Sequence, residues 1–432
     1  MIRRRFLQTS TAIMALQAKT YSQVAGANER IQVGLIGAGD MGMRHLRTLL
    51  TQDDVSLVHI ADPDRTRLAA AVVAATRGDH VPRANADLRR VFDDRAVTAV
   101  VIATPDHWHA PAAILALDAG KHVYVESPGS HNIREGRLMI DAARRANKVC
   151  QVGAPLRSSE HALAAMNLLR DGAIGDVLAA RVWNSRLRRD IGRRQPSRTP
   201  DTLDYDLWVG PAPMVPHQSN RLHDDWRWWH AFGSGDMGSE GVHDLDLGRW
   251  GLGIDAHPAA VVGLGGKDFF DDDREFPDTQ TVVFEWPDVG GKKKQLVYEQ
   301  RLWTPGRTEG HANGAAFQGT RGQLVIGREA GWTLFGEGNR EIRRMAGRPN
   351  LLAHHRDFFA CARSGRRPSA DVEISHLSTT LCHLGNIATK VRRTLHFDPR
   401  TEEVQNDKQA GSMHRREYRE GHWAVPARVV EE

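Results

Sequence analysis

The chain has too few cysteines for a disulfide-stabilised or thiolate-metal protein. Only Cys150, Cys361 and Cys382 occur in 432 residues, each in an apolar or helical setting. Their spacing matches neither a disulfide framework nor a zinc motif. We therefore expect three core thiols and no bound metal.

The chain also lacks a strong charge of one sign and any long apolar run. Its 58 lysines and arginines nearly balance 53 acidic residues, for a net charge of +5. The one compact basic run, Lys292–Lys294, follows two glycines between strand-like runs. A solvated hairpin tip is the simpler interpretation, and a binding patch is the alternative. We therefore expect no nucleic-acid partner and no membrane span, which would need about 20 apolar residues.

The N-terminus, "MIRRRFLQTSTAIMALQA", places Arg3 and Arg4 before a short apolar stretch, and small residues follow at 25–27. This pattern resembles a twin-arginine (Tat) signal peptide; the alternative is a disordered basic tail. Because Tat signals carry folded proteins, a cofactor would be loaded in the cytoplasm. We predict a signal peptide over residues 1–27 and a periplasmic or otherwise exported protein.

The length favours two domains, and the hydrophobic pattern changes near residue 153. Before it, apolar strands alternate with helical stretches, which predicts an α/β doubly wound parallel sheet of Rossmann type. After it, long period-two strands predict a second α/β domain, with helices over 352–363 and 373–394. The predicted boundaries are 28–153 for the nucleotide-binding domain, 154–395 for the substrate and oligomerisation domain, and 396–432 for a C-terminal extension.

A glycine motif follows the first predicted strand, Ile31–Ile36, in "IQVGLIGAGDMGMRHL". The first glycine permits a tight turn, the second lets the backbone approach a pyrophosphate, and the third lets a helix pack on the strand. Amides at the helix start then face the phosphates. The predicted cofactor-binding residues of the motif are Gly37, Gly39, Asp40, Met41 and Gly42.

An acidic residue stands where a dinucleotide's ribose is expected. Asp62 ends the second strand, 20 residues after Gly42. A carboxylate there accepts hydrogen bonds from both ribose hydroxyls and repels a 2′-phosphate, so NAD is favoured. Arg65, three residues further on, leaves NADP possible.

Further polar residues lie at the carboxyl ends of the other predicted strands, where ligands of such sheets bind. Two histidines, His107 and His109, follow the predicted strand at residues 99–103. We interpret them as polar contacts near the cofactor or as surface residues, and not as a metal site. The additional predicted cofactor-binding residues are Thr104, Pro105, His107, His109, Glu126 and Gln151.

Four segments, "GLIGAGDMG", "ATPDHWHAP", "AGKHVYVESP" and "GSEGVHDLDLGRWGLG", together resemble the glucose–fructose oxidoreductase and inositol dehydrogenase (Gfo/Idh/MocA) family over roughly residues 30 to 420. The chain is similar in particular to its exported, Tat-signalled members. The resemblance implies a Rossmann domain followed by a domain on a large, mostly antiparallel open sheet. Because one face of such a sheet must be covered, we expect a homodimer or homotetramer.

The family places its chemistry in a Glu-Lys-Pro triplet, whose lysine contacts the reacting hydroxyl, and in a helix-borne histidine that acts as acid/base. Here the lysine position holds Ser127 and the histidine is His243. A serine cannot supply the ammonium charge, and losing a positioned acid/base typically costs about 10²–10⁴ in rate. The resemblance therefore implies that His243 is the base, with Glu240 or Asp246 orienting it and Ser127 hydrogen-bonding substrate or water. A purely structural role for His243 and Asp246 is the alternative.

The Trp-rich segment and several polar residues resemble the substrate side of the exported relatives. The tryptophans at 226, 228 and 229 could equally pack between domains or stack on a sugar ring. The predicted substrate-contacting residues are Arg157, Arg221, His223 and Trp228.

Three functions remain open at this point. The first is an NAD(P)-dependent oxidoreductase acting on a hydroxyl of a sugar, glycoside or cyclitol; after export, its cofactor would have to stay bound and be recycled internally. The second is a redox-neutral glycosidase or lyase working by transient oxidation, for which relatives with Glu-Val-Pro give a precedent, although their "THG" segment is not visible here. The third is a catalytically silent sugar- or NAD-binding protein.

Overall fold

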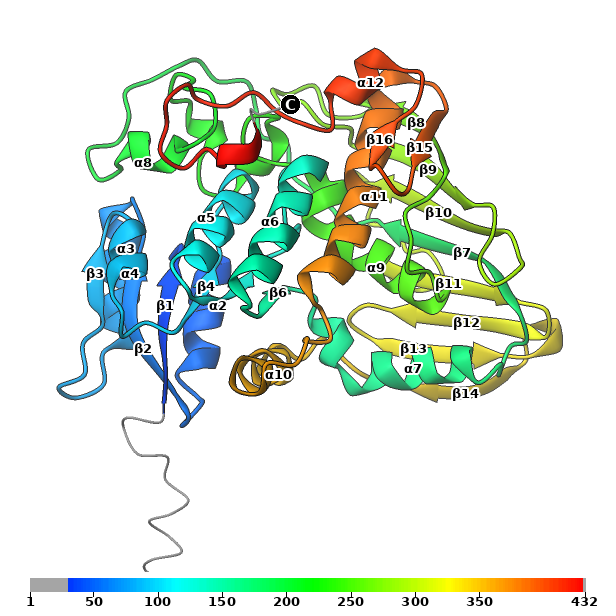
Figure 1. Cartoon of the computed structure of the whole chain (residues 1–432). Helices are drawn as coiled ribbons and strands as arrows, with labels where there is room; N and C mark the ends of the chain where they lie inside the picture. The colour runs from blue at the N-terminus through cyan, green and yellow to red at the C-terminus, as the bar shows by residue number, and fades with distance from the viewer. Residues whose placement is uncertain (1–29, 430–432) are drawn as a thin grey trace, which may run out of the picture.

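The computed structural model describes residues 30–429, and the predicted signal peptide lies outside them. Within this range the chain forms two sheets side by side, one from residues 31–152 and one from residues 177–404 (Figure 1). No helix between residues 30 and 429 is both long and apolar enough to cross a membrane.

The first sheet is parallel throughout, with six strands in the order β3-β2-β1-β4-β5-β6, which confirms the predicted doubly wound fold. The one strand not predicted is β3, because it is three residues long and largely exposed. The strands of the first sheet are β1 Ile31–Ile36, β2 Val55–Ala61, β3 Arg83–Asn85, β4 Ala99–Ile102, β5 His122–Val125 and β6 Cys150–Val152. The helices of this domain are α2 Asp40–Leu49, α3 Arg65–Ala75, α4 Arg89–Asp93, α5 Asp106–Asp118 and α6 Ile133–Ala146.

The central strands read as continuous apolar runs because both faces of the sheet are covered. In β4, Val100 and Ile102 pack into one core cluster with α5 and α6. Ala99 and Val101 enter another, which contains Phe358 of α10 (Leu351–Ser364). Successive side chains thus point to opposite faces, each closed by helices.

The second sheet has ten strands in the order β14-β13-β12-β11-β7-β10-β9-β8-β15-β16 and is antiparallel except for the β7–β10 pair. Along β9, intermediate and buried positions alternate, as expected for a sheet with one packed face. The stretch predicted as a C-terminal extension begins inside β15, which is hydrogen-bonded to β8. The strands are β7 Val177–Asn184, β8 Ala260–Gly266, β9 Thr279–Trp286, β10 Lys294–Arg301, β11 Asn313–Gly319, β12 Gly322–Gly327, β13 Gly331–Phe335, β14 Glu341–Met345, β15 Leu395–Asp398 and β16 Glu403–Val404.

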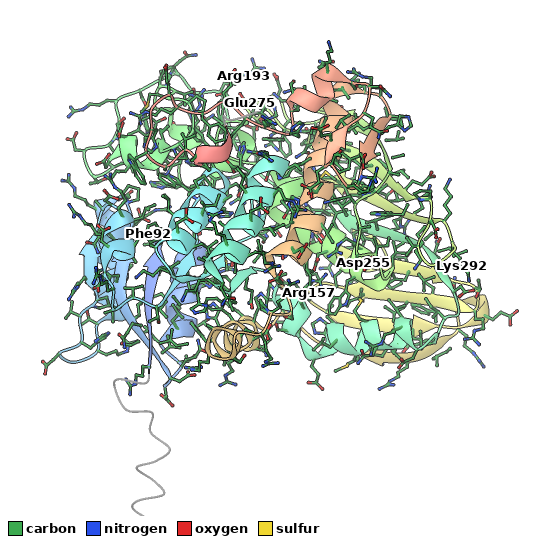
Figure 2. The ribbon with its side chains drawn as sticks, in the orientation of Figure 1. Phe92, Arg157, Arg193, Asp255, Glu275 and Lys292 are labelled. Atoms are coloured by element: carbon green, nitrogen blue, oxygen red, sulfur yellow. The ribbon has the colours of Figure 1, made fainter. Side chains whose placement is uncertain are left out.

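Helices α7 (Glu160–Arg170), α9 (Val242–Gly251) and α11 (Val372–Val391) contact the second sheet and close its core. The loop between β9 and β10 carries Lys292 and Lys293 on exposed side chains, which confirms the predicted solvated hairpin tip (Figure 2). The three cysteines are buried and free, as expected.

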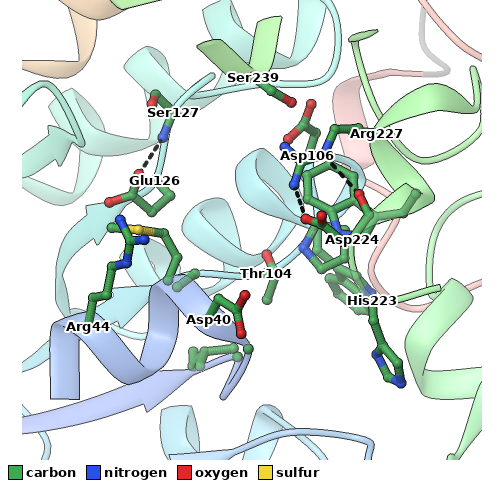
Figure 3. Close-up of a pocket in the computed structure, with 18 of the residues that line it drawn as sticks. Asp40, Arg44, Thr104, Asp106, Glu126, Ser127, His223, Asp224, Arg227 and Ser239 are labelled. Carbon is green, nitrogen blue, oxygen red and sulfur yellow. Dashed lines mark hydrogen bonds and ion pairs between the residues drawn. The ribbon is translucent and has the colours of Figure 1, made fainter. Parts of the chain in front are cut away.

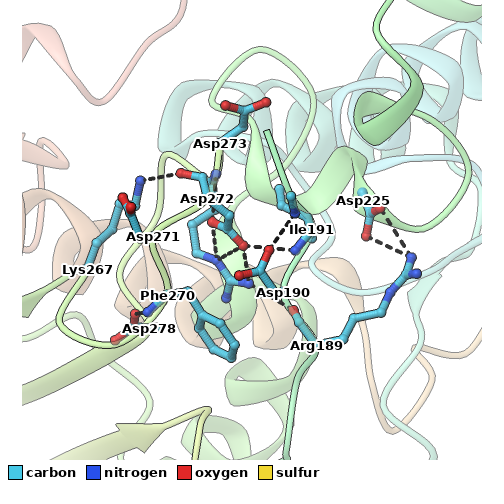
Figure 4. A network of polar contacts seen from close by, with 12 residues as sticks. Arg189, Asp190, Ile191, Asp225, Lys267, Phe270, Asp271, Asp272, Asp273 and Asp278 are labelled. Carbon is cyan, nitrogen blue, oxygen red and sulfur yellow. Dashed lines mark hydrogen bonds and ion pairs between the residues drawn. The ribbon is translucent and has the colours of Figure 1, made fainter. Parts of the chain in front are cut away.

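Residues 185–235 form an irregular segment that contains only one short α-helix, α8 (Tyr205–Val209). A buried polar network holds the segment against the loop that follows β8 (Figure 4). There Asp272 pairs with the Arg274 guanidinium and accepts the backbone N–H of Ile191 at 2.9 Å, and Arg274 also donates to the carbonyl oxygen of Arg189 at 2.9 Å. At the surface, Arg189 pairs with Asp225 within the segment. Because both partners of the Arg274–Asp272 pair are buried and bonded, they hold this part of the segment to the loop.

Candidate active site

One cleft of about 490 Å³ lies at the carboxyl ends of the parallel strands, lined on its other side by the 185–235 segment and the second domain (Figure 3). Its volume is within the usual range for small-molecule sites. Two-thirds of the predicted cofactor and catalytic positions gather there, from strand ends of the first sheet and from the start of the helix Val242–Gly251 with the turn before it: Gly37, Gly39, Asp40, Met41, Asp62, Thr104, Pro105, Glu126, Ser127, Glu240 and His243.

The glycine turn is shaped for a group that approaches the backbone. Gly37 has φ +90°, and a Cβ there would lie 2.5 Å from the carbonyl oxygen of Ala103. A Cβ at Gly42 would lie 2.0 Å from the carbonyl oxygen of Gly37, so the third glycine serves helix packing rather than the cleft itself. No side chain caps the start of α2 at Gly39, which leaves its first amides available to an anion.

Asp62 is held at the end of β2 by two backbone amides. One carboxylate oxygen accepts from Ala38 N–H at 2.7 Å and the other from Asp64 N–H at 2.8 Å. Burial raises the pKa of Asp62. Each oxygen keeps a lone pair for a ribose hydroxyl. Arg65 does not line the cleft, because its guanidinium bonds the Asp201 carbonyl at the surface; Arg67 lines the cleft instead.

Thr104 lines the cleft with a buried hydroxyl that has no partner among the described residues. Two predicted cofactor contacts lie behind this wall: His109 bonds the carbonyl oxygens of Pro128 (2.7 Å) and Thr104 (2.8 Å), and His107 bonds that of Trp208 at 3.0 Å. Burial lowers the pKa of His107 to about 3, so it is neutral. Both histidines therefore brace the backbone of the site. The bare glycine turn, the fixed Asp62 and the unpartnered hydroxyl fit a dinucleotide.

Gln151 also lies behind the site. It is fully buried in the middle of β6, and its amide donates to the carbonyl oxygen of His354 at 3.0 Å. It ties the first sheet to α10 and does not line the cleft.

The reacting end of the cleft is marked by Ser127 and His243. The hydroxyl of Ser127, just beyond β5, lies 3.3 Å from Nε2 of His243. His243 stands in the first turn of α9, directly after the π-helical turn Met237–Gly241. Burial and the nearby Arg328 guanidinium lower the pKa of His243 below its ordinary value, so the imidazole is neutral at pH 7 and able to accept a proton.

Glu126 is fixed by a buried pair of histidines that the sequence did not reveal. Its carboxylate bonds His45 Nε2 at 2.8 Å, and His45 Nδ1 in turn lies 2.8 Å from Nε2 of His355. Burial alone would raise the pKa of Glu126, but the hydrogen bond and charge of His45 outweigh it and lower the pKa to about 2. The carboxylate therefore remains ionised beside Ser127, whose backbone N–H donates to it at 3.3 Å.

Neither acidic residue expected to orient His243 is free to do so by hydrogen bonding. Glu240 is held by Arg328 at 2.6 Å and by Arg186, and Arg188 lies 3.5 Å away. These arginines outweigh the effect of burial and lower the pKa of Glu240 to about 2. Glu240 therefore acts on His243 through its charge, which favours the protonated imidazole.

Asp246 lies outside the cleft and forms a buried ion pair with Arg157 through two contacts of 2.8 Å. It also accepts a hydrogen bond from Ser378 of α11 at 2.7 Å. Arg157, one of the predicted substrate residues, is thereby committed to the junction between the domains (Figure 2). The pair connects the segment after the first sheet to α9, and so fixes the helix that carries His243.

Of the other predicted substrate residues, His223 alone lines the cleft, with φ +60°. Arg221 stacks on the Trp229 ring at 4.1 Å, and Trp228 is buried beneath the Arg274 guanidinium. The packing interpretation therefore holds for Trp228 and Trp229. Trp226, for which packing and sugar stacking were left open, lines the cleft. The cleft-lining residues that the sequence analysis missed on this side are Arg186, Arg188, Arg227 and Arg328, which no local pattern distinguishes.

Outside the cleft, one buried group has the residue types of a metal site. His257 Nε2 and His376 Nε2 lie 2.9 and 3.0 Å from the same oxygen of Glu402. Arg137 donates to the same carboxylate. These are hydrogen-bond contacts that satisfy the carboxylate without an ion, and they fasten the turn before β16 to α6 and α11.

Comparison with solved structures shows the same fold at low sequence identity. The aldose-aldose oxidoreductase from Caulobacter crescentus, complexed with glycerol, is 18% identical, with 85% of this chain and 100% of that chain covered and a TM-score of 0.65. A levoglucosan dehydrogenase in complex with NADH and levoglucosan is 21% identical (85% and 99% covered, TM-score 0.64). The WlbA dehydrogenase from Bordetella pertussis, in complex with NADH and UDP-GlcNAcA, is 19% identical (85% and 99%, TM-score 0.64). Among curated proteins, none matches the sequence.

Comparison with protein families gives two matches that follow the two sheets. Residues 31–154 match the NAD-binding Rossmann fold of the Gfo/Idh/MocA oxidoreductases. Residues 186–297 and 310–425 match the C-terminal alpha/beta domain of the same family. The chain belongs to the Gfo/Idh/MocA oxidoreductase family.

Proposed function

We propose that this protein oxidises a hydroxyl of a sugar, glycoside or cyclitol with NAD as hydride acceptor. The observation that carries the proposal is the contact between Ser127 Oγ and His243 Nε2 at 3.3 Å, in the same cleft as the glycine turn and Asp62. A neutral histidine, an adjacent hydroxyl and a dinucleotide cradle are together sufficient for removing a proton and a hydride from an alcohol.

NAD, when bound, accepts a hydride from the carbon that carries the reacting hydroxyl. The hydroxyl gives its proton to Ser127 Oγ while the Ser127 proton passes to His243 Nε2, so the serine is unchanged at the end. The imidazolium that forms is stabilised by the negative charges of Glu126 and Glu240, both of which raise the pKa of His243. Ser127 thus links the substrate hydroxyl to His243 without a lysine, and both residues line the cleft.

Asp62 favours NAD over NADP, because its buried carboxylate would face a 2′-phosphate. Arg67, which lines the cleft nearby, is the residue through which NADP could still be accepted. The choice of NAD rests on Asp62 being fixed by two backbone amides, so that it cannot turn away.

A redox-neutral cleavage of glycosides is the second candidate, and Ser127 favours it. In that reaction a transient ketone acidifies the neighbouring C–H, the aglycone is eliminated, and the hydride returns. The position that holds a lysine in the dehydrogenase motif here holds a group without charge, as it does in the relatives with Glu-Val-Pro that cleave glycosides by transient oxidation.

We also propose that the protein is exported by the Tat pathway with its cofactor bound, on the basis of the twin arginines at positions 3 and 4. A homo-oligomer is supported by the apolar side chains on the outer face of the second sheet, where Val262 and Leu264 of β8 are exposed. Size-exclusion chromatography with light scattering measures the oligomeric state.

The test of function starts by denaturing purified protein and identifying any released nucleotide. Native protein is then incubated with a panel of sugars, glycosides and cyclitols while absorbance at 340 nm and products are followed. A lasting NADH signal or a reduced second substrate supports the oxidoreductase. Free aglycone without net absorbance change supports cleavage, and bound nucleotide with no product from any substrate contradicts both.

A further inference from the structure

The C-terminal part of the chain, residues 413–429, crosses the first domain as a strap. It follows α12 (Lys408–Ser412), which lies by the second sheet, and runs over the ends of α5 and α6 (red in Figure 1). It contains no helix longer than one 3₁₀ turn, Ala427–Val429. Its position is therefore fixed by contacts with other parts of the chain.

Two sets of contacts anchor this strap. Arg416 Nε and the Tyr418 hydroxyl both donate to Glu135 of α6 at 2.8 Å, and Glu135 is fully buried. On the other side, Arg419 N–H donates to the carbonyl oxygen of Pro211 at 3.0 Å. The strap is thus tied to α6 and to the irregular segment that faces the cleft.

Trp423, in the middle of the strap, lines the cleft. Its ring lies 5.7 Å from that of Trp108 and 4.2 Å beneath the Arg89 guanidinium. Leu88, directly before Arg89, lines the same wall. Arg89 covers one face of this half-exposed indole, and the Trp108 ring is tilted by 43° to it rather than stacked on it. The part of the indole that lines the cleft offers an apolar surface for a flat ligand.

The order of the strands identifies which part of a dinucleotide this wall would meet. The pyrophosphate belongs at the Gly37 turn after β1, and the adenosine ribose at Asp62 after β2. The next strand outward in the sheet is β3, and the residues that follow it reach Leu88. The wall formed by Leu88 and Trp423 thus lies beyond the ribose, at the end opposite Ser127 and His243.

We propose that Trp423 is a cofactor-binding residue that covers the adenine base, and that the strap slows the release of NAD. This inference rests on the proposed NAD-dependent function. Since the strap is anchored outside the cleft, the nucleotide can leave only after its base has lost contact with Trp423. A protein that must work where free nicotinamide nucleotide is scarce would use this contact to retain its cofactor.

The test compares nucleotide fragments on the full-length protein stripped of bound nucleotide. The Kd values of NAD⁺, ADP-ribose, AMP and nicotinamide mononucleotide are measured by calorimetry for wild type, Trp423→Ala and Trp423→Phe. Trp303→Ala is the matched control, since Trp303 is a partly exposed tryptophan of the second domain that does not line the cleft. Thermal unfolding of each variant reports folding.

We expect Trp423→Ala to weaken NAD⁺, ADP-ribose and AMP by about tenfold, the usual effect of losing one base–aromatic stack, and to leave nicotinamide mononucleotide unchanged. Trp423→Phe should recover most of the affinity, and Tyr418→Phe, which removes one anchor of the strap, should speed NAD⁺ dissociation in a stopped-flow chase. Equal affinities of Trp423→Ala and wild type for AMP and ADP-ribose, or an equal loss for nicotinamide mononucleotide, would overturn the role of Trp423 while leaving NAD binding intact. A wild type that binds neither NAD⁺ nor ADP-ribose would overturn the proposed function as well.

Discussion

Removing the hydroxyl of Ser127 separates two possible roles of this residue. If Ser127 only orients His243, Ser127→Ala removes one hydrogen bond between neutral groups, worth about 0.5–1.5 kcal/mol. That corresponds to a fall in kcat of roughly 2- to 13-fold, since 1.36 kcal/mol is a factor of ten. The observed Oγ–Nε2 distance of 3.3 Å, at the long end for such a bond, places the expected cost in the lower part of this range.

If Ser127 carries the proton, the same variant loses a positioned proton-transfer group, and kcat should fall by about 10² or more. We expect this larger effect, because Ser127 and His243 both line the cleft and the Ser127 hydroxyl lies within hydrogen-bond reach of the imidazole. Ser127→Thr, which keeps the hydroxyl, should retain most of the activity. His243→Asn should lose about 10³, and the double variant Ser127→Ala with His243→Asn should lose no more than that, because the two residues act as one unit.

The assay is kcat and single-turnover NADH formation with the best substrate of the panel, together with NAD⁺ affinity to show that the cofactor site is intact. A fall of less than tenfold in Ser127→Ala would assign Ser127 an orienting role only. Losses that multiply in the double variant would refute the relay, since independent groups contribute independently.

Three further predictions follow from other contacts of the site and the fold. Because burial and Arg328 lower the pKa of His243, kcat/KM should rise with pH to a plateau with a midpoint below 6.5, and Arg328→Met should move that midpoint upward in a pH series. Asp62→Ser should weaken NAD⁺ by about 10- to 100-fold and reduce the preference over NADP⁺, as measured by the two Kd values; an unchanged ratio would remove Asp62 from the ribose site. Glu402→Gln should destabilise the protein by about 3 kcal/mol in urea unfolding at pH 7 while NAD⁺ affinity stays constant. Burial would raise the pKa of Glu402, but its bonds to His257, His376 and Arg137 outweigh burial and lower it. The stabilisation is therefore present above the unfolded pKa near 4.3. As the pH falls below that value, the difference in unfolding free energy between wild type and Glu402→Gln should become smaller.

The first sheet and its cradle could be predicted because their signals are local. The run Ile31–Ile36, the three glycines and the distance from Gly42 to Asp62 each depend on a few neighbouring residues, and each is in place in the structure. Thr104 and Glu126 were predicted to lie in the same cleft because each follows a parallel strand, and parallel strands end at one edge of a sheet.

The partners of those residues could not be predicted, because they come from distant parts of the chain. His45 reads as one polar residue of the helix after the glycines, and only the packing of α10 against α2 reveals the chain Glu126–His45–His355. Arg328 follows a strand of the second sheet and is one arginine among many in the sequence. Its effect on His243 depends on the strand register of the second sheet, which no local sequence pattern predicts.

Two charged residues, one predicted to contact substrate and one to orient His243, show the opposite error. Arg157 and Asp246 were each read as site residues, but the fold pairs them with one another in a buried contact. A buried arginine without such a partner would be costly. The Asp246 carboxylate is therefore needed to pair with Arg157 and is not available for catalysis. The sequence offers no means to pair two charges 89 positions apart.

The serine in the Glu-Ser-Pro triplet changes what the rest of the site must do. A lysine would supply both a proton path and a positive charge at the reacting oxygen, whereas Ser127 supplies only the path. Arg328 lines the cleft, but its charge is largely committed to Glu240 at 2.6 Å. The site is therefore built to keep His243 neutral rather than to stabilise an alkoxide, and it suits a reaction in which proton and hydride leave together or a hydroxyl that is already acidic.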